Sequence, residues 1–439
     1  MLVFKNRDMI MSSDNEILWK EYNLNDIVFY DVLWLIERIK SSEMEVVLFG
    51  ASAEARYALA VLKYYDVDVD YICDSSFERH GTIFCGYKLA SPDILLNDVR
   101  NVCVFICASY PGPILSTLRL LEVECVYSCV SLFSSTDMKS LSYNFDGIRV
   151  GKSDRDIERD VDLYRHEFSK FTNRVSGDGL RLHAIDVVIT ESCSMKCKDC
   201  SNLMQYYSSP KKAELTVLYH TLDKILSVID YVYELRVLGG EPFMVKNINE
   251  VIDKLVLYEN VGEVVVYTNG TIVPKGDNLK SLKDKKVLVD ISDYGDLSRN
   301  YHKLKDSLEE NGIRYAAKIP RWTDSGKFVH DGDKTENQLK EMFSNCCVND
   351  VLTLLHGKLY HCPFSAHAAN LKAIPDEPSD VIDIDALNKD DLRIELNDFY
   401  RKKQYLTACG YCNGRDFNTP DIEVAIQTKN PLPIPILFE

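Results

Sequence analysis

Short apolar runs alternate with amphipathic stretches between residues 45 and 150. The run "EVVLFG" has the length of a buried strand, and "ASAEARYALAVLKYY", which follows it, has helical periodicity. This alternation continues along the segment and predicts a doubly wound α/β unit with a parallel sheet, assigned to residues 1–150. The strand candidates of this unit are 45–50, 67–74, 101–109 and 125–130.

A second alternating pattern begins at residue 183, after a highly charged stretch that predicts a helical connector over 151–182. Helix-like segments separate its apolar strands, so the pattern predicts a parallel barrel or partial barrel over 183–330. A further cysteine set and a proline-rich tail mark a third region, 331–439. The strand candidates of the second region are 183–190, 234–240, 263–270, 286–292 and 314–319.

Composition and charge narrow the possible partners. The 439 residues carry a net charge of −16, which argues against a broad nucleic-acid surface because phosphate contacts need clustered lysine and arginine. The N-terminus has no basic region followed by an apolar run, and no stretch approaches the length of a membrane span. A cytoplasmic location is therefore expected, and the 14 cysteines should stay reduced, so that clusters of cysteines indicate metal binding or catalysis rather than disulfides.

Three cysteines lie in the loop "ITESCSMKCKDC", directly after a predicted strand. Cys193, Cys197 and Cys200 form a CxxxCxxC spacing, and thiolates suit iron–sulfur clusters. A cubane held by three cysteines keeps one iron free to bind another molecule. Two alternatives remain: an amphipathic helix that buries the three thiols on one face, and a zinc site that takes a fourth ligand from elsewhere.

Two more motifs follow predicted strands, "GGEP" at 239–242 and "YTNGT" at 267–271. Together with the cysteine loop they resemble the radical S-adenosylmethionine superfamily, over about 140 residues. The resemblance implies a partial (β/α)6 TIM-like barrel. It also implies a 4Fe–4S cluster on the three cysteines, with the methionyl group of S-adenosylmethionine chelating the open iron. The residues implied to contact this cofactor are Gly239, Gly240, Glu241, Pro242, Asn269, Ser292 and Asp293.

The reaction implied by the resemblance is reductive cleavage of the sulfonium. One electron from the cluster yields methionine and a 5′-deoxyadenosyl radical, which abstracts hydrogen from a substrate. A flavodoxin- or ferredoxin-type protein is the expected reductant. The sequence assigns no catalytic acid, base or hydrogen donor to the substrate.

The C-terminal region contains a second cysteine set. Cys362 follows Gly357 in a GxxxxC pattern, and Cys409 and Cys412 form a CxxC pair. The set resembles the Twitch or SPASM extensions of radical S-adenosylmethionine enzymes, which carry auxiliary 4Fe–4S clusters. The shorter, one-cluster form is implied, with Cys346 as the fourth ligand and Cys347 as the alternative to it. A zinc site with four cysteine ligands is the competing interpretation.

The first region carries an incomplete nucleotide-binding pattern. Gly50 lies at a strand-to-helix turn, Ser52 follows it, and Asp74 closes the next strand, where a carboxylate can meet a ribose. The segment resembles small Rossmann-like domains that bind nucleotide sugars. A Rossmann-like domain without a ligand is the alternative.

The leading functional hypothesis is a radical enzyme that oxidises, epimerises or rearranges a sugar or nucleotide-linked sugar in polysaccharide or glycoconjugate biosynthesis. The first alternative is a radical enzyme that modifies peptides or proteins. The second is a zinc-stabilised, nucleotide-binding scaffold without catalytic activity. The sequence does not identify the substrate or choose between oxidation and epimerisation.

Overall fold

A computed structural model describes residues 32–42, 44–97, 101–108, 111–133, 136–141, 144–145, 148–149, 157, 160–161, 164, 179–326, 328–415, 419–429 and 431–434. The chain forms two compact units, residues 1–177 and 178–439. Most of the predicted connector lies outside the described residues. Among the described helices, none combines the length and apolarity needed to cross a bilayer.

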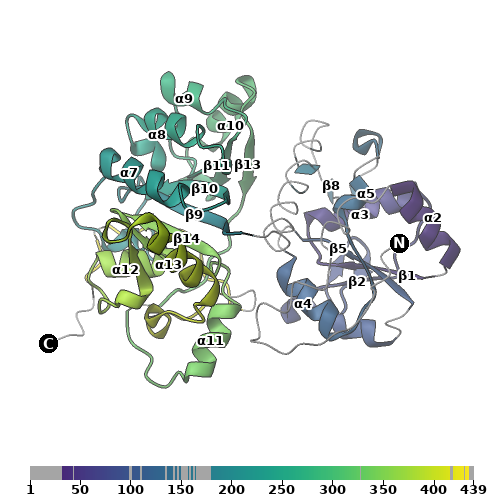
Figure 1. The fold of residues 1–439 in the computed structure, drawn as a ribbon. Helices are drawn as coiled ribbons and strands as arrows, with labels where there is room; N and C mark the ends of the chain where they lie inside the picture. Colours follow the sequence, from purple (N-terminus) through teal and green to yellow (C-terminus); the bar gives the residue numbers. More distant parts are fainter. Residues whose placement is uncertain are drawn as a thin grey trace. The chain divides into compact units, whose positions relative to one another are not determined.

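The first unit contains a four-stranded parallel sheet in the order β2-β1-β5-β6. Helix α5 contacts both α2 and α3, and α4 lies on the other side of the sheet (Figure 1). Its main elements are α2 (Val32–Ser42), β1 (Glu45–Phe49), α3 (Ala53–Tyr64), β2 (Tyr71–Cys73), β5 (Val102–Ile106), α4 (Gly112–Leu120), β6 (Cys125–Ser128) and α5 (Val130–Phe133). Two short hairpins join β3 (Ile83–Phe84) to β4 (Tyr87–Lys88) and β7 (Asn144–Phe145) to β8 (Ile148–Arg149).

The second unit is built on one eight-stranded sheet in the order β13-β12-β11-β10-β9-β14-β15-β16. The strands from β13 to β14 in this order are parallel neighbours, and β15 and β16 add antiparallel pairs at one edge. The strands are β9 (Arg181–Thr190), β10 (Tyr231–Gly239), β11 (Val261–Thr268), β12 (Val287–Ser292), β13 (Tyr315–Lys318), β14 (Val351–Leu355), β15 (Lys358–Tyr360) and β16 (Val381–Asp383).

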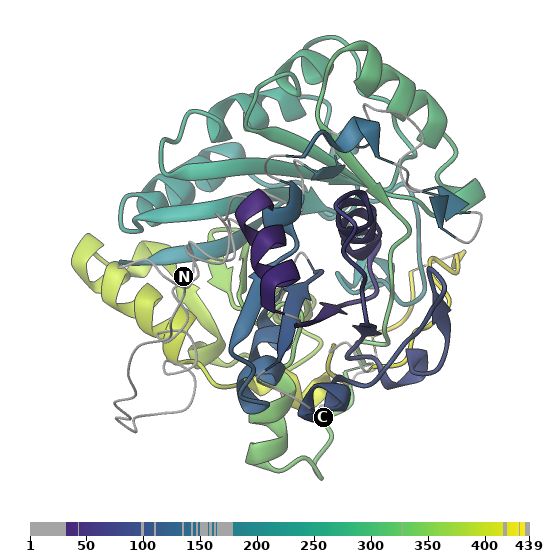
Figure 2. The same ribbon diagram turned by 90° about the vertical axis from the view of Figure 1, so that its right-hand side faces the viewer.

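Helices connect these strands, and several of them cover one face of the sheet. Figure 2 shows several of them along the outer side of the parallel strands. The helices are α7 (Leu215–Leu226), α8 (Ile248–Leu255), α9 (Asp277–Ser281), α10 (Tyr301–Glu310), α11 (Glu336–Ser344), α12 (Pro363–Asn370) and α13 (Lys389–Lys402). Alternation along the strands explains the core: Val187 of β9 and Val237 of β10 pack with Leu222 of α7 and Ile252 of α8. On the opposite face Ala366 of α12 packs with Val188 of β9, and other positions of that face carry polar side chains.

The predicted α/β class with parallel sheets is confirmed in both units. The predicted strands of the second region agree with β9 to β13 within a few residues. The third predicted region does not form a separate unit, because β14 pairs with β9 and extends the same sheet.

Candidate functional site

The three-cysteine loop leaves the carboxyl end of β9. Cys197 is buried, Cys193 and Cys200 are half-buried, and all three are free thiols. They cluster around the buried Met195 side chain, with Ala425 of a distant segment. The loop is not a regular helix, which removes the predicted alternative of an amphipathic helix with the thiols on its buried face.

Burial is the largest influence on the pKa values of these three thiols. It raises the pKa of Cys193 to about 12 and that of Cys197 to about 11, and it also raises the pKa of Cys200. Repulsion between the neighbouring thiolates acts in the same direction for Cys193 and Cys197. A bound cationic centre reverses this balance and deprotonates coordinating thiols. Three free thiols grouped in one loop, with burial as the largest influence on their pKa values, therefore fit an iron–sulfur cluster.

The GGEP loop approaches the cysteine loop through its two glycines. A Cβ atom on Gly239, whose φ is +146°, would lie 2.0 Å from the carbonyl oxygen of Thr190. A Cβ atom on Gly240 would lie 2.1 Å from the carbonyl oxygen of Ser192. The backbone N–H of Gly240 donates to Thr190 at 2.9 Å, and that of Glu241 donates to Ser192 at 2.8 Å. Glycine is thus required for these two loops to touch.

The Glu241 side chain fastens the end of β11 to this loop. Its carboxylate accepts hydrogen bonds from the backbone N–H of Asn269 at 2.8 Å, the hydroxyl of Thr268 at 2.9 Å and the backbone N–H of Phe243 at 3.1 Å. The side chain has no exposed surface, and burial raises its pKa to about 7. Pro242 is also buried and begins the short turn that follows.

Asn269 connects the third motif to the cysteines. Its amide nitrogen lies 3.6 Å from the Cys193 sulfur and donates to the Ser194 hydroxyl at 3.1 Å. Its side-chain oxygen accepts from the backbone N–H of Thr271 at 3.1 Å. The structure therefore brings the cysteine loop, the GGEP loop and Asn269 together at one edge of the sheet.

The end of β12 lies at the same edge. The Ser292 side chain hydrogen-bonds to Tyr294, and the Tyr294 ring packs edge-on against Trp322 at 5.8 Å. Both aromatic side chains contact the cluster of residues around the three cysteines. The Asp293 carboxylate accepts from the backbone N–H of Gly295 at 2.9 Å and closes the turn. Ser292 and Asp293 thus flank the cysteine loop, on the side of Tyr294.

Sequence patterns missed a contribution from the C-terminal segment 419–429. Its residue Gln427 donates from the side-chain amide to the Cys197 sulfur at 3.2 Å. Ala425 of the same segment is 1% exposed and packs beside Met195. Nothing in the local sequence around Gln427 indicates this contact, since it depends on a chain return of about 230 residues.

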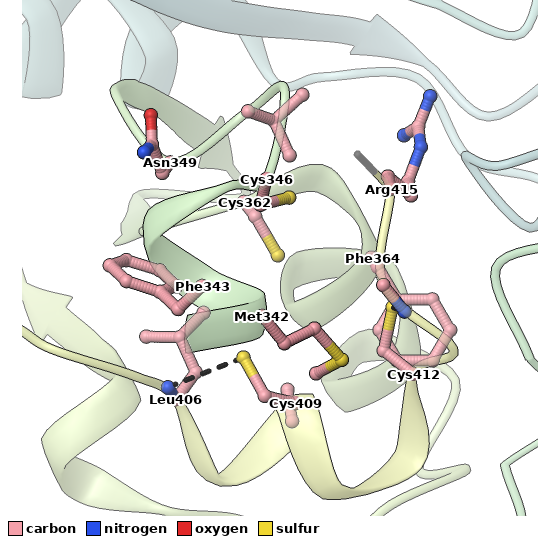
Figure 3. A pocket seen from close by; sticks show the side chains of 13 residues that line it. Met342, Phe343, Cys346, Asn349, Cys362, Phe364, Leu406, Cys409, Cys412 and Arg415 are labelled. Atoms are coloured by element: carbon pink, nitrogen blue, oxygen red, sulfur yellow. Dashed lines mark hydrogen bonds between the residues drawn. The ribbon is translucent and has the colours of Figure 1, made fainter. Parts of the chain in front are cut away.

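The second cysteine set surrounds a separate cavity. Figure 3 shows the sulfur atoms of Cys346, Cys362, Cys409 and Cys412 directed toward the same space, with the Met342 thioether beside them. Cys346 follows α11, Cys362 is the N-cap of α12, and the CxxC pair lies in the short helix Thr407–Tyr411 and directly after it. Burial raises the pKa of Cys409 to about 12 and also raises those of Cys362 and Cys412.

No three His, Cys, Asp or Glu side chains within the described residues are grouped closely enough to hold a single metal ion. A cubane binds each thiolate to a different iron, so its ligands do not need to meet at one point. Four free thiols around one cavity fit that arrangement.

Cys346 and Cys347 occupy different positions. Cys346 lines the cavity, whereas Cys347 is absent from its lining and is exposed. Hydrogen bonding from Cys346 and the nearby charge of Arg415 lower the pKa of Cys347 to about 6. The geometry thus favours Cys346 over Cys347 as a member of the four-thiol set.

Arg415 is a second residue that the sequence patterns missed. It lines the cavity of the second cysteine set, and its positive charge also acts on Cys200 of the first set. Its backbone oxygen accepts from the N–H of Cys347 at 2.9 Å, and its Nε atom is buried without a hydrogen-bond partner. A guanidinium therefore lies within electrostatic range of both thiol groups.

The face of the sheet opposite the helices is polar. Asp186 and Arg236 are register neighbours on β9 and β10, with 3.9 Å between a carboxylate oxygen and a guanidinium nitrogen. Lys318 pairs with Asp290 at 2.8 Å. Arg236 and Lys318 each lie 5.8 Å from the centre of the Tyr267 ring. Carboxylates and cationic side chains therefore lie side by side on this face, next to the edge that carries the cysteine loop, the GGEP loop and Asn269.

In the first unit, Gly50, Ser52 and Asp74 lie at the carboxyl edge of the sheet. The Ser52 hydroxyl donates to the carbonyl of Cys107 at 2.8 Å and accepts from the first turn of α3. The Asp74 carboxylate accepts from the backbone N–H of Ala51 at 2.9 Å and pairs with Arg79 at 2.8 Å. The three predicted residues are therefore brought together, and the Asp74 carboxylate is held by internal partners.

Comparisons with known proteins bear on the second unit. A family model described as a 4Fe-4S single cluster domain matches residues 175–311. GTP 3′,8-cyclase of Peptoclostridium acidaminophilum is 26% identical over 153 residues, which cover 33% of this chain and 46% of the relative. GTP 3′,8-cyclase of Helicobacter pylori is 29% identical over 141 residues, which cover 28% of this chain and 43% of that relative. The chain spans less than half the length of these curated relatives.

Among solved structures, BtrN in complex with AdoMet and 2-DOIA is similar at 18% identity, with a TM-score of 0.34 and coverage of 57% of this chain and 97% of that one. Over the residues that they match, the family model and the curated relatives support the prediction of a radical S-adenosylmethionine enzyme with a 4Fe–4S cluster. The family model bears directly on the predicted 4Fe–4S cluster of the three-cysteine loop, which lies within the matched residues.

Proposed function

We propose that this radical S-adenosylmethionine enzyme abstracts hydrogen from a sugar or nucleotide-linked sugar, in order to oxidise, epimerise or rearrange it. One observation carries the proposal: Cys193, Gly240 and Asn269 meet at the carboxyl edge of the parallel strands, directly above a polar sheet face. Active residues gather at this edge in parallel α/β folds.

In this proposal Cys193, Cys197 and Cys200 hold the first cluster. When bound there, the cluster supplies the single electron that cleaves the sulfonium of the cofactor. The chain's own part is to bind and orient. The GGEP loop lies against the cysteine loop and presents its backbone there, while Asn269 holds the loop at Ser194. The aromatic pair Tyr294 and Trp322 packs beside the thiols and limits their exposure to water.

The finer fold assignment is part of the same proposal. We infer that the six parallel strands, β9 to β14, form a partial barrel whose helices lie outside and whose polar face lies inside. The alternation of core residues such as Val187 with polar residues such as Asp186 supports this inference. A partial barrel open at its side leaves room for a substrate larger than the cofactor.

The polar face supports a hydroxyl-rich substrate. Carboxylates accept hydrogen bonds from hydroxyl groups, and guanidinium and ammonium groups donate to them. Asp186 and Asp290 are both nearly buried, at 4% and 6% exposure, and each keeps one carboxylate oxygen without a hydrogen-bond partner. Two such oxygens on one sheet face match the several hydroxyls of a sugar better than an apolar side chain of a peptide.

We propose that Cys346, Cys362, Cys409 and Cys412 bind one auxiliary 4Fe–4S cluster. The four sulfurs facing one cavity support this set over one that includes Cys347 (Figure 3). Such a cluster would either bind the substrate or accept an electron from it. Because loss of an electron oxidises the substrate, this cluster favours oxidation among the three proposed outcomes. A flavodoxin- or ferredoxin-type donor in the cytoplasm would supply the first cluster's electron.

The proposed role of the first unit is to bind a nucleotide near Gly50 and Ser52. The N-terminus of α3 and the reversal of strand order between β1 and β5 support it, because ligands of such folds bind where the strand order reverses. The Asp74 carboxylate forms an ion pair with Arg79, and the Arg79 side chain is 43% exposed. A ribose would therefore have to share Asp74 with Arg79 or displace it.

Anaerobic turnover tests the proposal. Purified protein is reconstituted with iron and sulfide, and it should bind about eight irons if both clusters form. It is then reduced and mixed with S-adenosylmethionine and nucleotide sugars deuterated on the sugar ring. Deuterium should enter 5′-deoxyadenosine. The variant Cys193→Ala should lose this product, whereas the control Cys125→Ser, in the first unit, should keep it.

The alternatives predict different results. Deuterium transfer from peptides but not from nucleotide sugars would support a peptide-modifying enzyme. Tightly bound zinc in place of iron, together with the absence of 5′-deoxyadenosine, would support the scaffold hypothesis and contradict the proposal.

A further inference from the structure

The C-terminal segment 419–429 lies along the cysteine loop and pairs with it through an isolated antiparallel bridge. The backbone N–H of Lys198 donates to the carbonyl of Ile426 at 2.7 Å, and that of Thr428 donates to the carbonyl of Lys196 at 2.7 Å. These bonds flank an antiparallel bridge between Cys197 and Gln427. The segment is therefore held in register with the middle cysteine of the loop.

The Gln427 side chain makes three hydrogen bonds from this position. Its amide nitrogen donates to the Cys197 sulfur at 3.2 Å and to the carbonyl of Ala425 at 2.7 Å. Its amide oxygen accepts from the backbone N–H of Lys196 at 2.9 Å. The opposite orientation of the amide would place oxygen against the Ala425 carbonyl and nitrogen against the Lys196 N–H. The surroundings thus fix the N–H groups toward the sulfur.

The rest of the segment is anchored firmly enough to keep this geometry. Ala425 is 1% exposed and has a φ of +56°, a backbone conformation that persists only where the surroundings impose it. The backbone N–H of Ile422 donates to the carbonyl of Trp322 at 2.9 Å. The segment therefore packs in the same cluster as Met195, Cys197 and Trp322.

We propose that Gln427 is a positioning residue that tunes the reduction potential of the first cluster through an N–H···S hydrogen bond to Cys197. Hydrogen bonds to cluster sulfurs and solvent exposure both set the potential of iron–sulfur centres. A donor favours the reduced cluster, because reduction adds negative charge to the sulfurs. The inference rests on the proposed cluster at Cys193, Cys197 and Cys200.

The test compares Gln427→Leu and Gln427→Glu with the wild type in the full-length, reconstituted protein. Leucine removes the donor, and glutamate keeps an acceptor for the Lys196 N–H but donates nothing when ionised. The ratio of reduced to oxidised cluster at a fixed potential should fall about tenfold in Gln427→Leu, which corresponds to about 59 mV for one electron. It should fall at least as far in Gln427→Glu.

A second measurement detects the hydrogen bond directly, beginning with the wild-type protein. Pulsed electron–nuclear spectroscopy of the reduced wild-type cluster should show a coupled exchangeable proton that disappears in deuterated solvent. That coupling should weaken in Gln427→Leu.

The matched control is Thr428→Val. The Thr428 hydroxyl lies 3.2 Å from the carbonyl of Lys196, in the same segment but away from any sulfur, so this variant should keep the wild-type potential. An unchanged potential and an unchanged proton coupling in Gln427→Leu, with full iron and sulfide content, would overturn the inference. An absence of the cluster from the wild type itself would instead overturn the proposed function.

Discussion

At the scale of single residues, the polar sheet face holds charge in a buried setting. Asp186 is 4% exposed. Burial raises its pKa to about 6, while the neighbouring Arg236 opposes that rise. Glu234 and Arg415 are the other charged groups that act on it, and the nearby Thr353 side chain also lowers its pKa. The protein thus retains a carboxyl group that prefers the neutral form near pH 5.

The variant Asp186→Asn should change how stability depends on pH. Because the folded pKa of Asp186 lies above its ordinary value of 3.8, the native state binds more protons than the unfolded state between pH 4 and 6. Its contribution to stability is therefore lost as pH rises through that window. As pH rises from 4 to 7, the free energy of unfolding of Asp186→Asn should increase by up to about 3 kcal/mol relative to that of the wild type. Denaturant unfolding at each pH measures this difference.

An exposed carboxyl provides the control for this measurement. Asp296→Asn lies in an exposed turn and should follow the wild-type curve. Parallel curves for Asp186→Asn and wild type across the window would contradict the prediction.

At the scale of elements, the site depends on how closely two loops approach. The loops after β9 and β10 share backbone hydrogen bonds only because Gly239 and Gly240 have no side chains. Strand pairing brings the loops to the same edge, and the glycines then allow contact.

The variant Gly240→Ala should displace the cysteine loop. Its Cβ atom would meet the Ser192 carbonyl at 2.1 Å, a backbone atom that has little freedom to move. We expect a loss of about 1–3 kcal/mol of unfolding free energy, together with lower iron content after reconstitution. Thermal unfolding and iron analysis measure the two effects.

Gly332→Ala is the matched control, because a Cβ atom there meets nothing within 4 Å. Wild-type iron content in Gly240→Ala would show that the close approach is not needed for the cluster.

At the scale of the whole molecule, the two units have separate cores. Buried residues of the first unit form one cluster around β1 and β5, and those of the second unit pack around β9 and β10. Both cysteine sets of the proposed clusters lie in the second unit. Ligands that bind only the native state stabilise the unit that contains them.

Removal of iron by chelation should therefore loosen only the second unit. Hydrogen exchange followed by mass spectrometry on the full-length protein should show faster exchange in peptides from 178–439, most strongly in 193–200 and 406–412. Peptides from β1, β5 and α3 should keep their protection.

The cluster-loaded protein at the same temperature is the reference. Equal loss of protection in both units would contradict the separation of their stabilities.

The sequence alone determined the features that are local in the chain. Alternating apolar runs predicted the parallel strands, since burial of one or both strand faces imposes that pattern, and short cysteine spacings predicted both thiol sets. The addition of β14 to the main sheet and the contacts of Gln427 and Arg415 were decided by the tertiary structure. These features depend on pairings across long sequence separations, for which a single chain carries no periodic signal.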